Sequence, residues 1–146
     1  MKKILSLFSG CGGLDLGFEQ AGFQPVVAYD LVHIAVDTYN SNRNKNIAVQ
    51  ADLSKLTVSE IIQKIENRIS DEPIVGAIGG PPCQAFSRGN VHPKAHDIRR
   101  ELPIHYAEIL KELNQKYGLH FFVFENVEGL TLNRHKEAFT QFRQLF

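Results

Sequence analysis

Short apolar segments alternate along the chain with stretches of helical periodicity, and this alternation constrains the fold more than any other feature. The apolar segments lie at residues 4–8, 25–29, 47–50, 74–78 and 120–124. The helical patterns lie at residues 13–21, 32–42, 58–69 and around 104–113. Parallel strands need helical crossovers of this kind, and right-handed crossovers cover both faces of the sheet. The pattern therefore predicts an α/β fold with an open, doubly wound and mainly parallel sheet.

The size and composition are those of one soluble domain. The 146 residues fit a single domain over residues 1–146, and 43% hydrophobic with 22% charged residues excludes a mainly disordered chain. No apolar run approaches the ~20 residues of a membrane-spanning helix, so we expect no membrane association. Two cysteines without metal-ligand spacing predict neither a disulfide framework nor a zinc site. We therefore expect a protein of the reducing cytoplasm.

The formal net charge is zero, whereas a free-standing binder of duplex DNA is usually basic. A nucleic-acid partner would therefore need local charge, or charge supplied by another part. The segment 88–100 offers such a local cluster. It contains Arg88, His92, Lys94, His96, Arg99 and Arg100. These side chains suit phosphate contact, and the alternative is a solvated loop.

The C-terminal segment carries a strong amphipathic stripe. Its apolar members are Ala138, Phe139, Phe142, Leu145 and Phe146. The chain stops on this stripe without a glycine cap, so we expect the front part of a larger unit. A terminal helix docked on the sheet is the alternative.

Glycines or carboxylates follow every predicted strand. In an open α/β sheet, ligands bind beyond the carboxyl ends of the strands, and all five ends open on one edge. The residues after the successive strands are Phe8–Gly13, Asp30, Asp52, Gly79–Gln84 and Glu125 with Asn126. Their coincidence at one edge predicts a ligand site there.

The first three strand ends suggest an adenosine ligand. Gly10, Gly12 and Gly13 let a ligand approach the backbone, although such glycines also serve strand–helix packing. Their spacing matches neither a dinucleotide fingerprint nor a P-loop. Asp30 could accept hydrogen bonds from ribose hydroxyls, and Asp52 from an adenine amino group. The alternative for both acids is a helix cap or a turn.

The fourth and fifth strand ends suggest a nucleophile with a nearby acid. Cys83 follows Pro81 and Pro82, which stiffen the turn, and a thiolate is a strong nucleophile near neutral pH. The alternative is a buried structural cysteine. Glu125 ends an apolar strand, where a raised pKa would let it donate a proton, with Asn126 fixing its geometry. A salt-bridged acid is the alternative there.

Four motifs together resemble those of the DNA (cytosine-5) methyltransferase family, in a match from about residue 4 to residue 130. Phe8–Leu14 resembles the family's cofactor loop, and Gly80–Ser87 resembles its highly specific nucleophile loop. Glu125–Val127 resembles its Glu-Asn-Val motif, and Asp97–Tyr106 resembles its Asp-x-Arg helix start. The order of the four motifs is also that of the family.

The resemblance implies a Rossmann-like S-adenosylmethionine-dependent methyltransferase fold, incomplete at its C-terminus. It implies S-adenosylmethionine as methyl donor, S-adenosylhomocysteine as product, and no metal. By that analogy Asp30 holds the ribose, Leu31 packs on the adenine, and Asp52 and Leu53 contact the adenine edge. The remaining implied cofactor contacts are Phe8, Ser9, Gly10, Gly12, Gly13, Leu14 and Pro81.

The resemblance also implies double-stranded DNA as partner and a target cytosine that is flipped out of the duplex. Cys83 would attack carbon 6 and Glu125 would stabilise the charge at nitrogen 3, with Pro82 and Asn126 beside them. Carbon 5 would then take the methyl group. Implied DNA contacts are Gln84, Ser87, Arg88, Lys94 and Arg99. We expect a restriction-modification setting.

Two departures from the family pattern matter. Tyr29 and Asp30 stand where the family often has Asn-Glu, and the shorter acid can still reach a ribose. The family's Gln-x-Arg-x-Arg segment, target-recognition region and closing helix have no counterpart, so a C-terminal companion chain or a missing segment is expected. The alternatives are a non-catalytic nucleoside-binding module and an RNA cytosine methyltransferase. A nicotinamide-linked oxidoreductase would give no role to Cys83 with Glu125.

Overall fold

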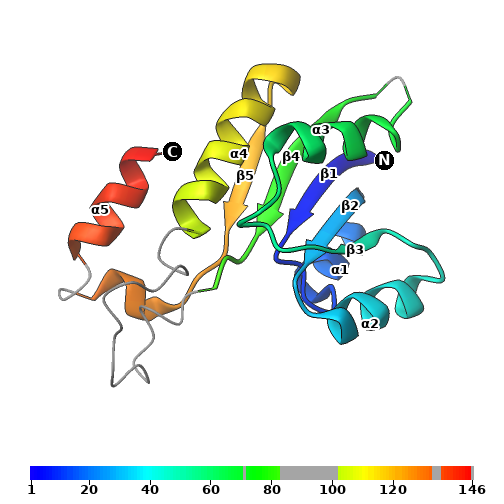
Figure 1. The fold of residues 1–146 in the computed structure, drawn as a ribbon, viewed down its shortest axis with the longest axis horizontal. Helices are drawn as coiled ribbons and strands as arrows, with labels where there is room; N and C mark the ends of the chain where they lie inside the picture. Colours follow the sequence, from blue (N-terminus) through cyan, green and yellow to red (C-terminus); the bar gives the residue numbers. More distant parts are fainter. Residues whose placement is uncertain (71, 83–101, 133–135, 146) are drawn as a thin grey trace.

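The protein is built on one sheet of five parallel strands. In this computed structural model, which describes residues 1–70, 72–82, 102–132 and 136–145, the strand order is β3-β2-β1-β4-β5 (Figure 1). The strands are β1 (Lys2–Leu7), β2 (Phe23–Asp30), β3 (Ala48–Gln50), β4 (Ile74–Gly79) and β5 (Phe121–Phe124). The order reverses direction beside β1, which confirms the predicted doubly wound α/β fold.

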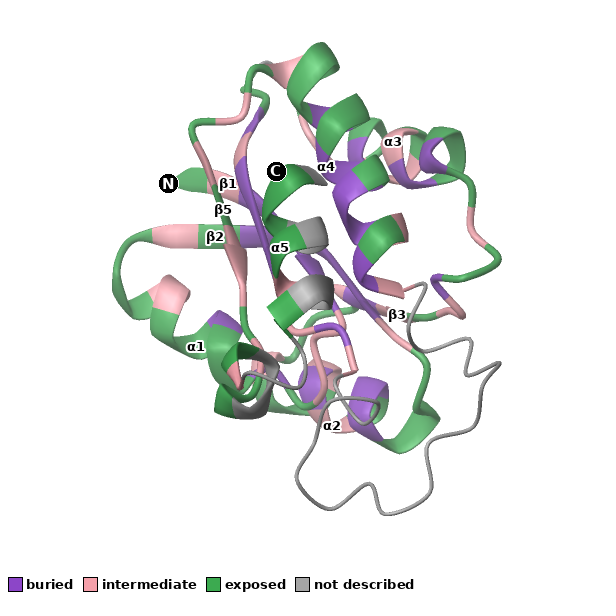
Figure 2. Ribbon diagram, turned by 90° about the vertical axis from the view of Figure 1, so that its left-hand side faces the viewer, coloured by how far each residue is buried: buried purple, intermediate pink, exposed green. Residues whose placement is uncertain are grey.

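Helices cover both faces of the sheet. They are α1 (Gly13–Gln20), α2 (His33–Arg43), α3 (Val58–Glu66), α4 (Leu102–Tyr117) and α5 (Lys136–Leu145), with a 3₁₀ turn, η2 (Glu128–Thr131). Helices α1 and α2 lie on one face, and α3 and α4 lie on the other (Figure 2). Helix α5, which carries the C-terminal stripe, contacts α4 and η2.

The larger core lies between the sheet and helices α3 and α4. Ile61 and Ile65 of α3 and Ile109 and Leu113 of α4 are completely buried there, as is Leu5 of β1. The helical spacing of the isoleucines in the segment 58–69 predicted this buried face. On the face covered by α1 and α2, the cluster of buried apolar side chains is smaller than the cluster between the sheet and helices α3 and α4.

Most element boundaries differ from the expected ones by one to three residues, and those of β2 and α3 have a local physical reason. Strand β2 begins at Phe23, before Pro25, because the register with β1 shifts directly after Pro25 and the missing N–H is tolerated at such an irregularity. Helix α3 ends at Glu66 rather than at residue 69. Its start is fixed by a capping box, in which Thr57 accepts from the Glu60 backbone N–H and the Glu60 carboxylate accepts from Thr57.

Candidate active site

The strand ends come together at one edge of the sheet. Leu7, the last residue of β1, pairs with Tyr29 and with Gly79, and Gly79 in turn pairs with Phe124. The last residues of β2 and β3 also pair with each other. The loops after all five strands therefore leave the sheet from the same edge, as the parallel topology requires.

The loop after β1 is tied to the end of β2. The backbone N–H of Ser9 donates to the Tyr29 carbonyl at 3.0 Å, and that of Gly10 donates to Oδ2 of Asp30 at 2.8 Å. Gly10 has φ +53°, which glycine adopts without strain. Phe8 has φ +56°, which is strained for a residue with a side chain. The residues around Phe8 therefore hold it in this left-handed conformation, with which the loop begins.

One side of this glycine loop is open. A Cβ atom added at Gly10 or Gly13 would meet none of the described residues within 4 Å. Cys11 is exposed as a free thiol, and Leu14, at the start of α1, is also exposed. The Ser9 hydroxyl is shielded from solvent and has no hydrogen-bond partner among the described residues. The loop thus presents accessible backbone at Gly10 and Gly13 next to a Ser9 hydroxyl that has no hydrogen-bond partner among the described residues.

The other side of the loop is closed by side chains that the sequence analysis did not single out. Arg43 and Tyr39 of α2 lie against Gly12, and Asp15 of α1 is completely buried beside Tyr39. Burial raises the pKa of the Asp15 carboxyl, although hydrogen bonds from Tyr39 and Ser6 oppose this effect. A carboxylate in the first turn of a helix is usually exposed and favoured by the helix dipole, so its position gave no signal of burial.

Asp30 links the glycine loop to the start of α2. Its Oδ2 accepts from Gly10, and its Oδ1 accepts from the backbone N–H of Val32 at 2.9 Å. Asp30 therefore fills the turn role that was part of the alternative interpretation, since Val32 is the N-cap of α2 and no side chain caps that helix, while the Asp30 carboxylate keeps lone pairs for a further donor. The adjacent Leu31 side chain is 61% exposed.

Asp52 and Leu53 follow β3 in different environments. Asp52 accepts hydrogen bonds from the backbone and the hydroxyl of Ser54 and contacts Lys55 at 3.1 Å. Hydrogen bonds from Ser54 and then Lys55 lower the pKa of the Asp52 carboxyl. Leu53 is buried in the core, so only its backbone is left to meet a ligand.

Glu125 lies directly against the loop that leaves β4. Its backbone N–H donates to the Gly79 carbonyl at 2.8 Å. A Cβ atom added at Gly80 would lie 2.7 Å from Oε2 of Glu125, so the glycine makes room for the carboxylate. Asn126 donates from Nδ2 to the carbonyl of the buried Pro81 at 3.4 Å. These contacts join the fourth and fifth strand ends.

Tyr106 of α4 connects both halves of this edge. Its hydroxyl donates to the Val123 carbonyl at 2.7 Å, close to the end of β5. Its ring centre lies 6.4 Å from that of Phe8 and 5.7 Å from that of Phe124. Burial raises the pKa of the Tyr106 phenol, which keeps it a hydrogen-bond donor. The sequence analysis noted Tyr106 only as the end of a motif.

The remaining predicted residues lie outside the part that the structure describes. The nucleophile candidate Cys83 is among them, whereas Pro82, just before it, is half-buried. The others are the expected DNA contacts Gln84, Ser87, Arg88, Lys94 and Arg99.

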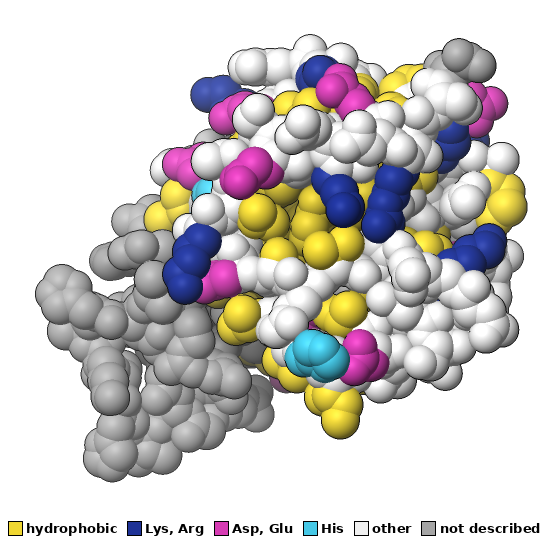
Figure 3. Space-filling view, turned by 45° about the vertical axis from the view of Figure 1, so that its right-hand side comes forward, with side chains coloured by type: hydrophobic (Ala, Val, Ile, Leu, Met, Phe, Trp, Pro, Cys, Tyr) yellow, Lys and Arg dark blue, Asp and Glu magenta, His cyan; other side chains and the backbone are white. Residues whose placement is uncertain are grey.

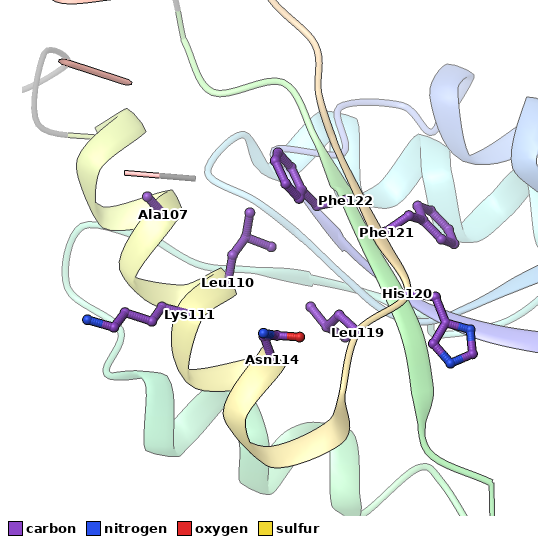
Figure 4. Close-up of a pocket in the computed structure, with 8 residues that line it drawn as sticks. All are labelled: Ala107, Leu110, Lys111, Asn114, Leu119, His120, Phe121 and Phe122. Carbon is purple, nitrogen blue, oxygen red and sulfur yellow. The ribbon is translucent and has the colours of Figure 1, made fainter. Parts of the chain in front are cut away.

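The described surface also has hollows away from this edge. A groove of about 510 Å³ lies between α4 and β5, where Leu110 and Phe122 face each other (Figure 4), and none of the strand-end residues lines it. Basic and acidic side chains are interspersed on the face shown in Figure 3, in line with the zero net charge. Among the described residues, no cluster of His, Cys, Asp or Glu could hold a metal, and no helix could cross a membrane.

Comparisons with known proteins agree on one family. The family model for C-5 cytosine-specific DNA methylases matches residues 2–146. The Type II methyltransferase M.NgoPII of Neisseria gonorrhoeae is 40% identical over 99% of this chain and 38% of its own length. M.FnuDI of Fusobacterium nucleatum is 42% identical over 93% of this chain and 35% of its own length.

A solved structure is similar over nearly the whole chain. It is that of an E. coli prophage-encoded protein assigned as a DNA modification methyltransferase, with TM-score 0.77 and 32% identity. The match covers 99% of this chain and 37% of that protein. The chain thus spans little more than a third of the length of each of these three proteins.

Proposed function

Since this chain belongs to the C-5 cytosine-specific DNA methylase family, we propose that it forms the cofactor-binding and catalytic part of a DNA (cytosine-5) methyltransferase of a restriction-modification system. The observation that carries the proposal is the register of the strand ends, which brings the glycine loop, Asp30 and Glu125 to one edge. Because the chain spans 35–38% of these relatives, recognition of the DNA target would belong to a companion segment or chain.

The glycine loop has the features that a nucleoside with an amino-acid tail requires. Its open side at Gly10 and Gly13 admits a close approach to the backbone, and the unpartnered hydroxyl of Ser9 could bond to a polar group. Asp30 retains acceptor capacity for ribose hydroxyls, and the exposed Leu31 next to it could pack on an adenine ring. These residues fit S-adenosylmethionine.

Each residue type at the other strand ends has a chemical role in this proposal. The Cys83 thiolate would attack carbon 6 of a flipped-out cytosine, while Glu125 donates a hydrogen bond or proton to nitrogen 3. Bound S-adenosylmethionine would supply an electrophilic methyl group to carbon 5 and leave as S-adenosylhomocysteine. Loss of the proton from carbon 5 to a base then restores the ring double bond and expels the Cys83 thiolate.

Calorimetric titration tests the cofactor half of the proposal. We expect the chain to bind S-adenosylmethionine and S-adenosylhomocysteine, and we expect no heat of binding with NAD as the control dinucleotide. Binding of NAD instead of the methyl donor would overturn the methyltransferase assignment, because the glycine spacing would then serve a different cofactor.

Covalent capture tests the catalytic half. Fluorine cannot leave carbon 5 as a cation, so a duplex containing 5-fluorocytosine should stay bonded to the attacking cysteine. A random duplex pool presents many target sequences at once, and the chain is assayed together with the segment or chain proposed to recognise the target, with the methyl donor present. We expect a gel-stable adduct that Cys83→Ser abolishes and the matched Cys11→Ser retains. An adduct that persists in Cys83→Ser would disprove the nucleophile assignment, and RNA capture in place of DNA would change the substrate.

A further inference from the structure

A buried polar cluster underlies the glycine loop, and the proposed chemistry gives it no role. Asp15, in the first turn of α1, is completely buried. Its Oδ1 accepts a hydrogen bond from the Tyr39 hydroxyl at 2.8 Å, and its Oδ2 accepts one from the Ser6 hydroxyl at 3.0 Å. A carboxyl group is costly to bury unless it is hydrogen-bonded. Both of its oxygens are bonded here, so the cluster fixes the position of the Tyr39 ring.

Arg43 connects this cluster to the loop itself. Its guanidinium carbon lies 3.8 Å from the centre of the Tyr39 ring, and its Nη2 donates to the Gly12 carbonyl at 3.1 Å. Nε and Nη2 also donate to the Glu19 carboxylate, each at 2.9 Å. Because the guanidinium is a planar fork of donors, these contacts together define one position for the side chain.

Gly12 rests directly on these two side chains. It has φ +87°, and an added Cβ would lie 2.6 Å from both the Tyr39 ring and Nη1 of Arg43. The Gly12 carbonyl also accepts from the backbone N–H of Leu16 at 3.0 Å, within the first turn of α1. The loop and the helix start therefore share one support, which leaves the backbone at Gly10 and Gly13 uncovered.

We propose that Asp15, Tyr39 and Arg43 are positioning residues that hold the glycine loop in the shape that receives the methionine end of S-adenosylmethionine. The inference rests on the proposed function. Glycines let a loop adopt many conformations. A ligand that orders such a loop on binding reduces the conformational entropy of the loop, and this cost lowers its affinity. The contacts of Tyr39 and Arg43 with Gly12 instead order the loop when the chain folds, before the ligand binds. These side chains thus raise cofactor affinity without touching the cofactor.

The decisive variant is Arg43→Lys, with Arg68→Lys as its matched control. Lysine keeps the charge but has no fork that can reach Glu19 and the Gly12 carbonyl together. Arg68 also joins backbone carbonyls, those of Val26 and Ile47, which belong to β2 and to the residue before β3 rather than to the loop. Calorimetry with S-adenosylmethionine and with adenosine, which lacks the methionine end, separates loop positioning from general loss of structure.

We expect Arg43→Lys to weaken binding of S-adenosylmethionine by about tenfold, the scale of one lost hydrogen bond, and to leave adenosine binding unchanged. Arg68→Lys should leave both affinities unchanged even where it lowers the midpoint of thermal unfolding. The milder Tyr39→Phe keeps the ring beneath Gly12 and removes only the bond to Asp15. It should shift affinity in the same direction by a smaller factor.

The exposed thiol of Cys11 gives a second readout that needs no ligand. The chain has two cysteines, so in a Cys83→Ser background Cys11 is the single reactive thiol. Its rate of reaction with a thiol reagent reports the conformation of the glycine loop. We expect Arg43→Lys to change this rate by severalfold and Arg68→Lys to leave it unchanged.

Two results would overturn the inference. One is an Arg43→Lys protein that unfolds more easily but keeps both the wild-type affinity and the wild-type Cys11 rate, because the cluster would then only stabilise the fold. The other is an equal loss of affinity for S-adenosylmethionine and adenosine. If the unaltered chain binds no S-adenosylmethionine, the proposed function fails, and a changed Cys11 rate would still support the positioning of the loop.

Discussion

Two glycine-to-alanine substitutions on β4 and its following loop should have opposite consequences. Gly76 and Gly80 are four residues apart, and neither has the positive φ that only glycine adopts easily. At Gly76, an added Cβ would lie 2.6–2.9 Å from three atoms of the Phe121 ring. That ring is stacked on Phe18 and set edge-on against Phe23, so it cannot move without disturbing both. Overpacking of this kind costs about 1–3 kcal/mol of stability.

At Gly80 the conflict is with the end of a flexible side chain. The added Cβ would lie 2.7 Å from Oε2 of Glu125, whereas ordinary contact begins at 3.4 Å. The Glu125 carboxylate must therefore move by about 0.7 Å, which costs little because it is exposed. Alanine also restricts the unfolded chain, an effect worth about 0.4–1 kcal/mol. Gly80→Ala should thus keep wild-type stability and displace the proposed acid.

Urea unfolding and carbon-13 NMR of the Glu125 carboxyl measure the two effects on the chain itself. We expect Gly76→Ala to lose stability and keep the Glu125 signal, and Gly80→Ala to do the reverse. In the full-length protein, Gly80→Ala should slow capture of 5-fluorocytosine DNA by about 10–100-fold, since a misplacement near 1 Å can cost 10²-fold. Equal destabilisation by the two substitutions, or an unchanged Glu125 signal and capture rate in Gly80→Ala, would refute this reasoning.

Three further substitutions probe the glycine loop by binding and stability measurements. Asp30→Asn replaces an acceptor of two backbone N–H groups, so calorimetry should show S-adenosylmethionine binding weakened by about 1.5–3 kcal/mol, whereas the exposed Asp37→Asn should leave it unchanged. Gly13→Ala meets no atom of the chain, so urea unfolding should show equal or higher stability, and weaker binding would place the ligand at this backbone. The pKa of the Asp15 carboxyl is raised above 3.8 in the folded chain, so the stabilising proton is lost as pH rises. In urea titrations, the stability of the wild type relative to Asp15→Asn should fall as pH rises from about 4 through the folded pKa, and a difference that does not vary with pH would contradict the burial argument.

The fold, and the position of the candidate strand-end residues at one edge of the sheet, could be predicted from the order of the strands. Alternating apolar and helical patterns identify the strands, and in a parallel sheet every carboxyl end reaches the same edge. Asp30 and Glu125 could be selected for that reason alone, before any contact was known. Asp30 also shows the limit of such selection, because its carboxylate both accepts from two backbone N–H groups of the chain and is a candidate ligand residue. The roles proposed for the predicted site residues stay predictions.

The residues that hold the site in shape could not be predicted by the same reasoning. Periodicity assigns polar residues of a helix to solvent, whereas Asp15 of α1 is buried and Leu14 and Leu16 of the same helix are exposed. Tyr39 and Arg43 lie on α2, and their partners Asp15 and Glu19 lie 24 residues earlier on α1. Such pairing depends on how two helices pack on one face of the sheet, which no local spacing encodes.

The glycines of the strand ends illustrate why a motif can be more specific than any of its members. Gly12 is required by the chain itself, since Tyr39 and Arg43 leave no room for a Cβ. Gly80 is required by Glu125, a residue of another motif. At Gly13, where φ is not positive, an added Cβ would meet no described atom within 4 Å, which fits the proposal that a ligand approaches this backbone. One residue type thus meets a packing constraint at Gly12 and a constraint from a neighbouring strand end at Gly80, and we propose that a ligand sets the third at Gly13. Each constraint arises from a different part of the site, so these glycines in this chain order are more specific together than any one of them alone.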